Sequence, residues 1–234
     1  MRLNRFRYLN RGYSEVLVLI PGWGFDARIF EPLNLDFNYI LPEINDLEHF
    51  SSDLMSALVE KDIKRVSLLG WSMGGFLAVN FLEKYGREFV QEILLISMRK
   101  SYPKKEIDSQ IGLLIKDRRL YLNRFYRNCF MGQKNDLAWF KEHLFPSYIE
   151  MFDLEFLLKG LDYLMQQRLK TATLKESPVR IIHGAKDRIA PCSGIVEIAE
   201  NISFPGIVIF EKSGHLPFLE PDFKKRLCWD INKG

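Results

Sequence analysis

Short runs of consecutive apolar residues recur along the chain, and each predicts a strand that is buried on both faces of a sheet. Five runs have this pattern: Val16–Ile20, Val66–Gly70, Ile93–Ile96, Val179–His183 and Ile207–Phe210. An earlier strand is expected over residues 5–10, where Arg11-Gly12 supplies a turn into the first buried run. The chain therefore carries the strands of a central sheet along most of its length.

Apolar residues at helical spacing lie between these runs and predict helices. The segments with this pattern are Asp53–Lys61, Gly75–Lys84, Ser193–Glu200 and Asp222–Ile231. Strands that alternate with helices indicate a mostly parallel central sheet flanked by helices on both faces. We therefore expect an α/β fold.

One long stretch interrupts this alternation. Between residues 99 and 175 no strand-like run occurs, and the helical patterns are rich in aromatic and charged residues. A segment of about 75 residues is too long for a simple loop in a compact domain. We therefore expect a single domain whose core comprises residues 1–98 and 176–234, with a helical lid at 99–175 inserted after the third buried strand.

The residues around Ser72 form the pattern G-x-S-x-G, from Gly70 to Gly74. The pattern follows a buried strand and opens a helix at Gly75, which is the setting of a nucleophile elbow. The flanking glycines allow the tight turn that would lift the hydroxyl above the sheet. We therefore predict that Ser72 is a nucleophile; the alternative is a glycine-rich turn that only packs the helix on the strand.

A serine nucleophile needs a base, and the base needs an acid that fixes its tautomer. Of four histidines, His215 alone lies in a loop after the last strand and before the last helix, whereas His183 ends a strand and is expected to be a packed core residue. Asp187 follows the fourth buried strand, although a simple turn aspartate would also fit there. The order Ser72, Asp187, His215 is the order found in α/β-hydrolases.

Acyl transfer also needs hydrogen-bond donors for the developing oxyanion. One should be the backbone N–H of Met73, the residue after the nucleophile. The second should come from the loop Pro21–Gly24, and we assign it to the N–H of Trp23. The alternative for this loop is a plain Pro-Gly turn. This chemistry needs no metal and no organic cofactor.

These motifs together resemble the α/β-hydrolases and, within them, the pimeloyl-[acyl-carrier protein] methyl ester esterases of biotin synthesis. The segments that carry the resemblance cover most of the chain: Gly22-Trp23-Gly24, Gly70–Gly75, Arg124-Phe125, Met131-Gly132 and Gly160–Leu164. Two features differ from that family, because Pro21 replaces a histidine and Leu41–Asp46 replaces a glycine-rich loop.

The resemblance implies a serine esterase that removes methanol from the methyl ester of pimeloyl bound to acyl-carrier protein. It places the family's triad on Ser72, Asp187 and His215 and its oxyanion donors on Trp23 and Met73. It places substrate contacts on the lid pair Arg124 and Phe125, and we add Trp23 and Trp71 as aromatic residues of an acyl channel. The two departures concern the pocket wall, and therefore the identity of the substrate rather than the triad.

Basic residues are concentrated in the first half of the expected lid. Residues 99–134 contain ten basic and three acidic residues, a net charge of +7 against +3 for the whole chain. If Lys116–Arg127 is one helix, four of these residues fall within an arc of about 140°: Lys116, Arg119, Arg124 and Arg127. Such a stripe would contact an acidic carrier protein. A solvated helix face is the alternative.

Composition excludes several other classes. The net charge of +3 is too small to indicate a nucleic-acid or membrane partner, and the longest apolar run is too short to span a bilayer. Three widely spaced cysteines indicate neither a disulfide framework nor a zinc motif. The N-terminal residues lack an apolar segment typical of a secretory signal. We expect a cytoplasmic monomer.

Two other functions fit the same residues. A general carboxylesterase, a thioesterase or a carbon–carbon bond hydrolase uses the same triad, so the sequence separates them poorly. A dehalogenase is disfavoured because that chemistry needs an aspartate at position 72. A non-catalytic ligand receptor on a hydrolase scaffold is the alternative of a different class.

Overall fold

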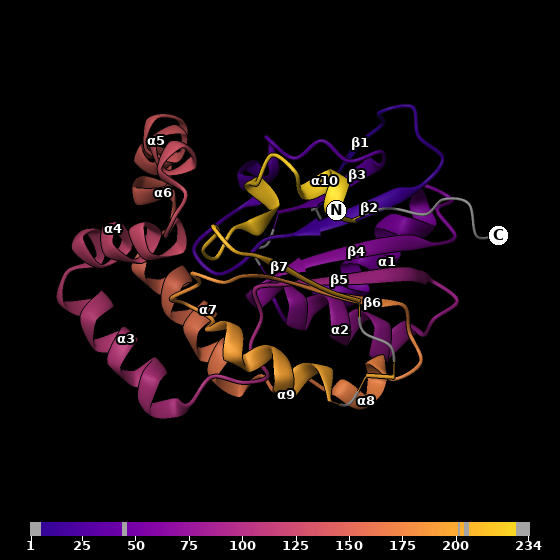
Figure 1. The fold of residues 1–234 in the computed structure, drawn as a ribbon. Helices are drawn as coiled ribbons and strands as arrows, with labels where there is room; N and C mark the ends of the chain where they lie inside the picture. The colour runs from indigo at the N-terminus through magenta and orange to yellow at the C-terminus, as the bar shows by residue number, and fades with distance from the viewer. Residues whose placement is uncertain (1–5, 44–45, 201, 204–205, 228–234) are drawn as a thin grey trace.

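A computed structural model describes residues 6–43, 46–200, 202–203 and 206–227 of the chain. Within these ranges the central element is a seven-stranded sheet in the order β1-β3-β2-β4-β5-β6-β7 (Figure 1). Its strands are β1 (Phe6–Leu9), β2 (Val16–Ile20), β3 (Asn38–Pro42), β4 (Val66–Trp71), β5 (Val90–Ile96), β6 (Val179–Gly184) and β7 (Gly206–Phe210). Only β1 runs antiparallel to its neighbour, so the prediction of a mostly parallel sheet is confirmed.

The strand β3 is the element of the sheet that the apolar runs do not indicate. It begins at a polar residue, Asn38, and ends at Pro42, which has no N–H to donate to a neighbouring strand. It nevertheless pairs with β1 on one side and β2 on the other. Both neighbours bury it, and the Asn38 side chain accepts a hydrogen bond from the backbone N–H of Arg11 at 2.7 Å.

Helices cover both faces of the sheet, as predicted. The helices α1 (Phe50–Glu60) and α2 (Met73–Tyr85) pack against each other, whereas α10 (Phe223–Leu227) lies on the opposite side of the sheet in Figure 1. The segment predicted as a helix over residues 193–200 contains a 3-10 turn, η2 (Cys192–Gly194), followed by α9 (Ile195–Ala199). The end of the last predicted helix, residues 228–231, lies outside the described residues.

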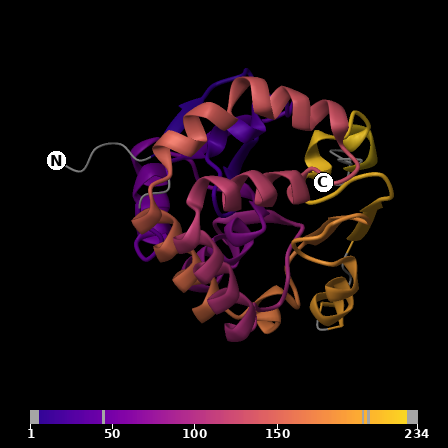
Figure 2. The same cartoon turned by 90° about the vertical axis from the view of Figure 1, so that its left-hand side faces the viewer.

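The stretch between β5 and β6 is helical, and we call residues 99–175 the helical insertion. Its helices are α3 (Lys104–Lys116), α4 (Arg118–Cys129), α5 (Lys134–His143), α6 (Phe145–Met151), α7 (Leu154–Gln166) and α8 (Thr171–Leu174). Figure 2 shows this insertion facing the viewer, in front of the sheet. Hydrogen bonds from α4 and α7 to the loop after β2 place it over the carboxyl ends of the parallel strands.

The segment Lys116–Arg127, which would have to be one helix for the basic stripe, is divided between two helices. The helix α3 ends at Lys116, and Asp117 is extended, with φ −158° and ψ 92°. Its carboxylate accepts a hydrogen bond from the backbone N–H of Leu120 at 2.9 Å and so caps the start of α4. Lys116 therefore lies on a different helix from Arg119, Arg124 and Arg127, and the four do not form one helical stripe.

None of the helices in the described ranges is long and apolar enough to cross a membrane.

Candidate active site

Ser72 lies in a strained turn between β4 and α2. Its backbone has φ 53° and ψ −117°, a conformation that a non-glycine residue rarely adopts. The turn is held because Ser72 donates its N–H to the carbonyl of Ile96 at 2.8 Å. A Cβ on Gly70 would lie 2.5 Å from the Cα of Gly75, and one on Gly74 would lie 2.3 Å from the carbonyl oxygen of Ile20. Only glycine fits at these two positions, as the motif predicts.

The loops after β6 and β7 bring Asp187 and His215 together. The Nδ1 of His215 lies 2.7 Å from Oδ2 of Asp187, and both side chains are buried. The other carboxylate oxygen accepts the backbone N–H groups of Ile189 and Ala190 at 2.8 and 2.9 Å. Burial opposes ionisation of Asp187, but the positive charge and hydrogen bonds of the neighbouring histidines outweigh it and lower the pKa of the carboxyl.

The backbone of His215 is fixed from two sides. Its N–H donates to the carbonyl of Cys129 at 2.7 Å, and its carbonyl accepts the indole N–H of Trp71 at 2.7 Å. Trp71 immediately precedes the proposed nucleophile, and its ring lies 5.4 Å from the imidazole ring. The arrangement places the imidazole beside the elbow.

His183 is a second buried histidine near the same carboxylate. Its Nε2 lies 2.6 Å from the carbonyl oxygen of Ala190 and 3.4 Å from Oδ2 of Asp187. It is therefore a packed core residue, as predicted, although its Nδ1 has no hydrogen-bond partner among the described residues. It therefore lies beside the same carboxylate oxygen that His215 contacts.

Tyr102 is a residue of this site that the sequence motifs do not indicate. It follows β5, is 8% exposed, and its phenol is close enough to the Ser72 side chain for that side chain to influence its pKa. Burial raises the pKa of Tyr102 to about 12, although Ser72 and the Arg99 guanidinium, 4.8 Å from its ring, act in the opposite direction. In the described part of the chain, no direct hydrogen bond joins Ser72 to His215; such contacts often tighten only when substrate binds.

The loop after β2 passes directly beside the elbow. A Cβ on Gly22 would lie 3.1 Å from the Cβ of Ser72. A cavity of about 480 Å³ opens on this loop and on the first residue of α2, and its lining includes Gly22, Trp23, Gly24, Phe25, Met73 and Phe156. Both predicted oxyanion donors therefore belong to residues that line one cavity.

The predicted substrate-binding residues have different surroundings. Trp23 lines the cavity, and its indole N–H donates to the carbonyl of Leu157 at 2.9 Å. Phe125 packs edge-on against Trp23 with ring centroids 4.9 Å apart, so it supports the cavity wall from behind. Trp71 is fully buried, its indole N–H holds the His215 loop, and it does not line this cavity. Arg124 is exposed and lines neither this cavity nor the next.

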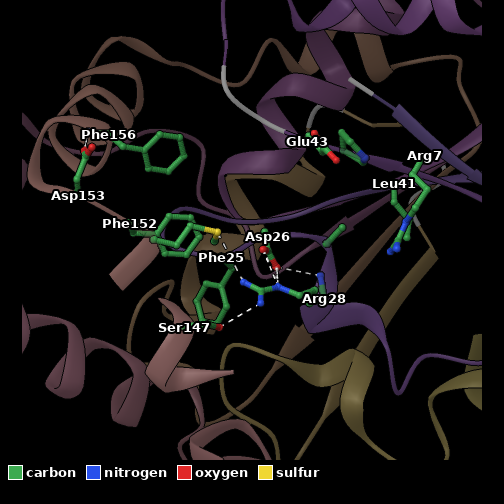
Figure 3. Close-up of a pocket in the computed structure, with 13 residues that line it drawn as sticks. Arg7, Phe25, Asp26, Arg28, Leu41, Glu43, Ser147, Phe152, Asp153 and Phe156 are labelled. Carbon is green, nitrogen blue, oxygen red and sulfur yellow. Dashed lines mark hydrogen bonds and ion pairs between the residues drawn. The ribbon is translucent and has the colours of Figure 1, made fainter. Parts of the chain in front are cut away.

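A second cavity of about 570 Å³ adjoins the first, and Phe25 and Phe156 line both. Figure 3 shows its polar wall, where the Arg28 guanidinium binds the Asp26 carboxylate at 2.9 Å and the Ser147 hydroxyl at 3.1 Å. The charges of Arg28 and Asp26 in this wall neutralise each other. Ser72, Asp187 and His215 line neither of the two cavities, and the first cavity reaches the elbow through Gly22 and Met73.

No group of three or more histidine, cysteine or acidic side chains is arranged to hold a metal ion in the residues that the structure describes.

The four predicted carrier-protein contacts lie at the outer surface of the insertion. All are exposed, and none forms an ion pair with another described residue. Arg119, Arg124 and Arg127 remain within an arc of about 140° on α4. By contrast, Arg118 turns inward and donates to the carbonyl of Ile149 at 2.7 Å.

Replacement of Gly184 by alanine should disrupt the loop that carries His215. A Cβ at this position would lie 1.9 Å from the carbonyl oxygen of Gly214 and 2.4 Å from that of Ser213. Because backbone atoms cannot turn aside as a flexible side chain can, we expect a loss of about 3 kcal/mol in the free energy of unfolding. The melting temperature should then fall by about 6–12 °C in a calorimetric scan.

The matched control is Gly112→Ala in the interior of α3, where no atom lies within 4 Å of the added Cβ. That variant should gain about 0.5–1 kcal/mol because alanine favours the helix. Equal melting temperatures for the two variants would contradict the close approach at Gly184.

Comparison with known proteins agrees with the fold. The profile of the alpha/beta hydrolase family matches residues 6–223. A relative from Wigglesworthia glossinidia brevipalpis, named pimeloyl-[acyl-carrier protein] methyl ester esterase, is 28% identical over 238 residues, which cover 90% of this chain and 90% of the relative. Among solved structures, an esterase from Exiguobacterium antarcticum has a TM-score of 0.79 at 21% identity, with 95% of this chain and 93% of that chain covered. A bromoperoxidase from Bacillus anthracis has a TM-score of 0.81 at 19% identity, with coverage of 95% and 92%.

The chain belongs to the alpha/beta hydrolase family. The predicted fold and the predicted class, a carboxylic-ester hydrolase, are both confirmed. The resemblance to the pimeloyl esterases is confirmed as well, since several curated relatives carry that name over about nine tenths of the chain. The solved structures, which are less than 25% identical, support the fold alone.

Proposed function

We propose that the protein is a serine esterase that demethylates pimeloyl-[acyl-carrier protein] methyl ester. The observation that carries the proposal is the buried Asp187–His215 pair, 2.7 Å apart, beside a serine held in a left-handed strand–helix turn. The relatives named for this reaction support the choice of substrate.

In the proposed mechanism, Ser72 attacks the ester carbonyl while His215 accepts the hydroxyl proton. Asp187 remains ionised because its pKa is lowered, and its charge stabilises the imidazolium that forms. The backbone N–H groups of Trp23 and Met73 bind the oxyanion. His215 then donates its proton to the departing methanol, and water activated by the same imidazole releases the acid.

Carrier-protein binding is proposed for the exposed basic residues of the insertion: Lys116, Arg119, Arg124 and Arg127. Their charges are not neutralised by ion pairs within the described part of the chain, so they are available to an acidic partner. Exposed charges of this kind act mainly on encounter and orientation, and salt screens them.

The proposal is tested with the purified protein on pimeloyl-carrier methyl ester and, in parallel, on p-nitrophenyl acetate. We expect a higher kcat/KM on the carrier-bound ester, and a loss of this advantage as salt is raised from about 0.05 to 0.5 M. Turnover of the short ester alone would contradict the carrier-protein substrate and leave the carboxylic-ester hydrolase class intact.

The double variant Arg119→Ala/Arg124→Ala tests the basic surface. We expect KM for the carrier-bound ester to rise about five- to tenfold, which corresponds to two exposed charge contacts at about 0.5–0.7 kcal/mol each. Turnover of p-nitrophenyl acetate should be unchanged, because neither arginine lines the cavities. The control Lys141→Ala removes an exposed charge from α5, and an equal effect there would count against a specific surface.

A general carboxylesterase or thioesterase is the second candidate. It is favoured by the two departures from the pimeloyl esterases, Pro21 and the segment 41–46. Leu41, Pro42, Glu43 and Asp46 line the two cavities, whereas Pro21 lines neither and residues 44–45 lie outside the described residues. Faster hydrolysis of short esters or of thioesters would select it. If the protein were a ligand receptor, a fluorophosphonate would still label Ser72, but none of these esters would be hydrolysed.

The proposal includes a cytoplasmic, monomeric enzyme that needs neither metal nor organic cofactor. Size-exclusion chromatography with light scattering tests the monomer. Retention of activity after dialysis against a chelator tests the independence from metal.

A further inference from the structure

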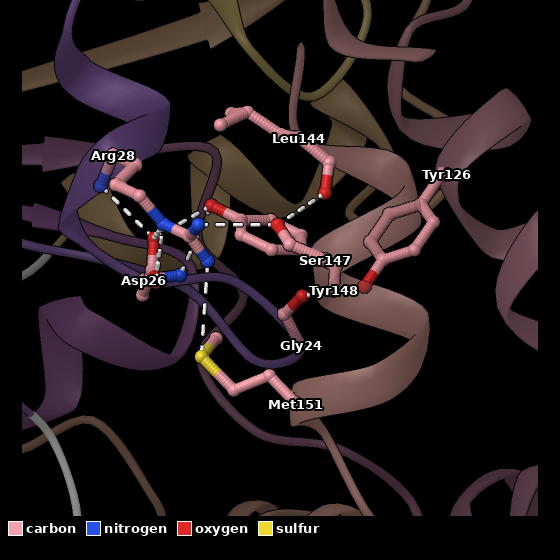
Figure 4. Close-up of polar contacts among 8 residues, drawn as sticks. All are labelled: Gly24, Asp26, Arg28, Tyr126, Leu144, Ser147, Tyr148 and Met151. Carbon is pink, nitrogen blue, oxygen red and sulfur yellow. Dashed lines mark hydrogen bonds and ion pairs between the residues drawn. The ribbon is translucent and has the colours of Figure 1, made fainter. Parts of the chain in front are cut away.

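The loop that supplies one proposed oxyanion donor is attached to the helical insertion along residues 23–26. Three hydrogen bonds make the attachment, and each involves a different helix. The indole N–H of Trp23 donates to the carbonyl of Leu157 on α7. The phenols of Tyr126 on α4 and Tyr148 on α6 donate to the carbonyl of Gly24 and to Oδ1 of Asp26. Their lengths are 2.9, 2.8 and 2.8 Å. Figure 4 shows both tyrosines directed at this loop.

Tyr126 is the anchor from α4, and it is deeply buried. It is 1% exposed, and its ring packs against Phe25 and Phe140 with centroids 5.0 and 4.8 Å away. Burial raises the pKa of Tyr126 well above its ordinary value, so the phenol remains a hydrogen-bond donor. Its acceptor, the carbonyl of Gly24, belongs to a residue with φ +71°, a conformation that glycine adopts without strain.

Tyr148 acts on the same loop through Asp26. Its phenol donates to the Asp26 carboxylate, and burial raises the pKa of Tyr148 so that it keeps this proton. The Arg28 guanidinium binds the same carboxylate and lies 5.0 Å from the centre of the Tyr148 ring. The Ser147 hydroxyl accepts from Arg28 at 3.1 Å, so α6 holds this end of the loop through several contacts (Figure 4).

The peptide N–H of Trp23 lies between two fixed points. On one side Gly22 packs against Ser72, and on the other side Tyr126 holds the carbonyl of Gly24. An oxyanion donor must be preorganised, because a displacement of about 1 Å costs about two orders of magnitude in rate. The contacts that hold Gly22 and Gly24 therefore also limit the positions that the Trp23 N–H can take.

We propose that Tyr126 and Tyr148 are positioning residues for ester hydrolysis, which set the backbone N–H of Trp23 through Gly24 and Asp26. The helical insertion then completes the oxyanion hole in addition to covering the site. This inference rests on the proposed serine-esterase function.

The test compares wild type with Tyr126→Phe, Tyr148→Phe and their combination on p-nitrophenyl acetate. Each single variant should lower kcat about tenfold, per active site titrated with a fluorophosphonate, while KM stays within about twofold. Inhibition by a trifluoromethyl ketone, whose adduct carries an oxyanion, should weaken by a similar factor. The control is Tyr121→Phe, which should match wild type. Among the described residues its phenol bonds to Gln110 within the insertion, and the substitution keeps the ring that lies edge-on to Trp23 at 6.2 Å.

Loss of a buried hydrogen bond also lowers the melting temperature, so stability alone does not test the inference. A merely structural role would lower the melting temperature of the variants and leave kcat per titrated site and the ketone affinity at wild-type values; that outcome overturns the inference. If wild type itself shows no Ser72-dependent turnover of any ester, the proposed function fails instead, and the two failures are distinguishable.

Discussion

Ser72→Ala is expected to lower kcat for ester hydrolysis by about four to six orders of magnitude, with KM little changed. The substitution removes the atom that forms the acyl intermediate, and the oxyanion donors alone retain only a small acceleration over water. Hydrolysis of p-nitrophenyl acetate under excess substrate, corrected for the uncatalysed rate, measures this loss.

The control for this variant is Ser97→Ala at the end of the neighbouring strand. Ser97 also has a positive φ, 50°, and its buried hydroxyl has no hydrogen-bond partner in the described ranges. The same substitution there should keep nearly full activity. Retention of more than about 1% of wild-type activity in Ser72→Ala would exclude a covalent serine mechanism.

Asp187→Asn should lower kcat by about four orders of magnitude while preserving the fold. The carboxylate fixes the tautomer in which Nδ1 of His215 carries the proton, and it stabilises the imidazolium during attack. An amide has no charge and can present its NH₂ group to the ring, so Nε2 would no longer be held ready to accept a proton from serine. The backbone N–H groups of Ile189 and Ala190 can still bond to the amide oxygen.

Steady-state kinetics from pH 5 to 9 measures the loss of kcat in Asp187→Asn, and circular dichroism checks that the variant is folded. The control is Asp108→Asn, which removes a carboxylate paired with Lys104 on the surface of α3. A loss of less than about tenfold in Asp187→Asn would show that another group orients the imidazole.

The fold could be predicted where burial is continuous. Apolar runs such as Val66–Gly70 leave no exposed face, so their pattern has one structural interpretation. The strand β3 escaped this pattern because its burial comes from two neighbouring strands rather than from its own composition. The break at Asp117 was not predicted because the helical spacing of basic residues continues across it. One side chain, the Asp117 carboxylate, caps the start of the second helix.

The candidate site was predictable where its residues occupy turns that follow strands. The elbow around Ser72 has a local sequence motif, and Asp187 and His215 follow strands in the expected order. The structure brings Asp187 and His215 into contact. Tyr102 and Tyr126 have no such signature, because their partners lie far away in the sequence and depend on how the insertion folds back. For the same reason the sequence could not show that Trp71 faces inward.

The contact between Trp23 and α7 limits how this chain can change during evolution. A Cβ on Gly160 would lie 2.5 Å from Cδ1 and 2.8 Å from Nε1 of the Trp23 indole. A larger residue at position 160 is therefore tolerated only if position 23 becomes smaller or α7 moves away. Across homologous sequences, the two positions should covary: glycine at 160 should accompany tryptophan at 23, and larger residues at 160 should accompany smaller ones at 23.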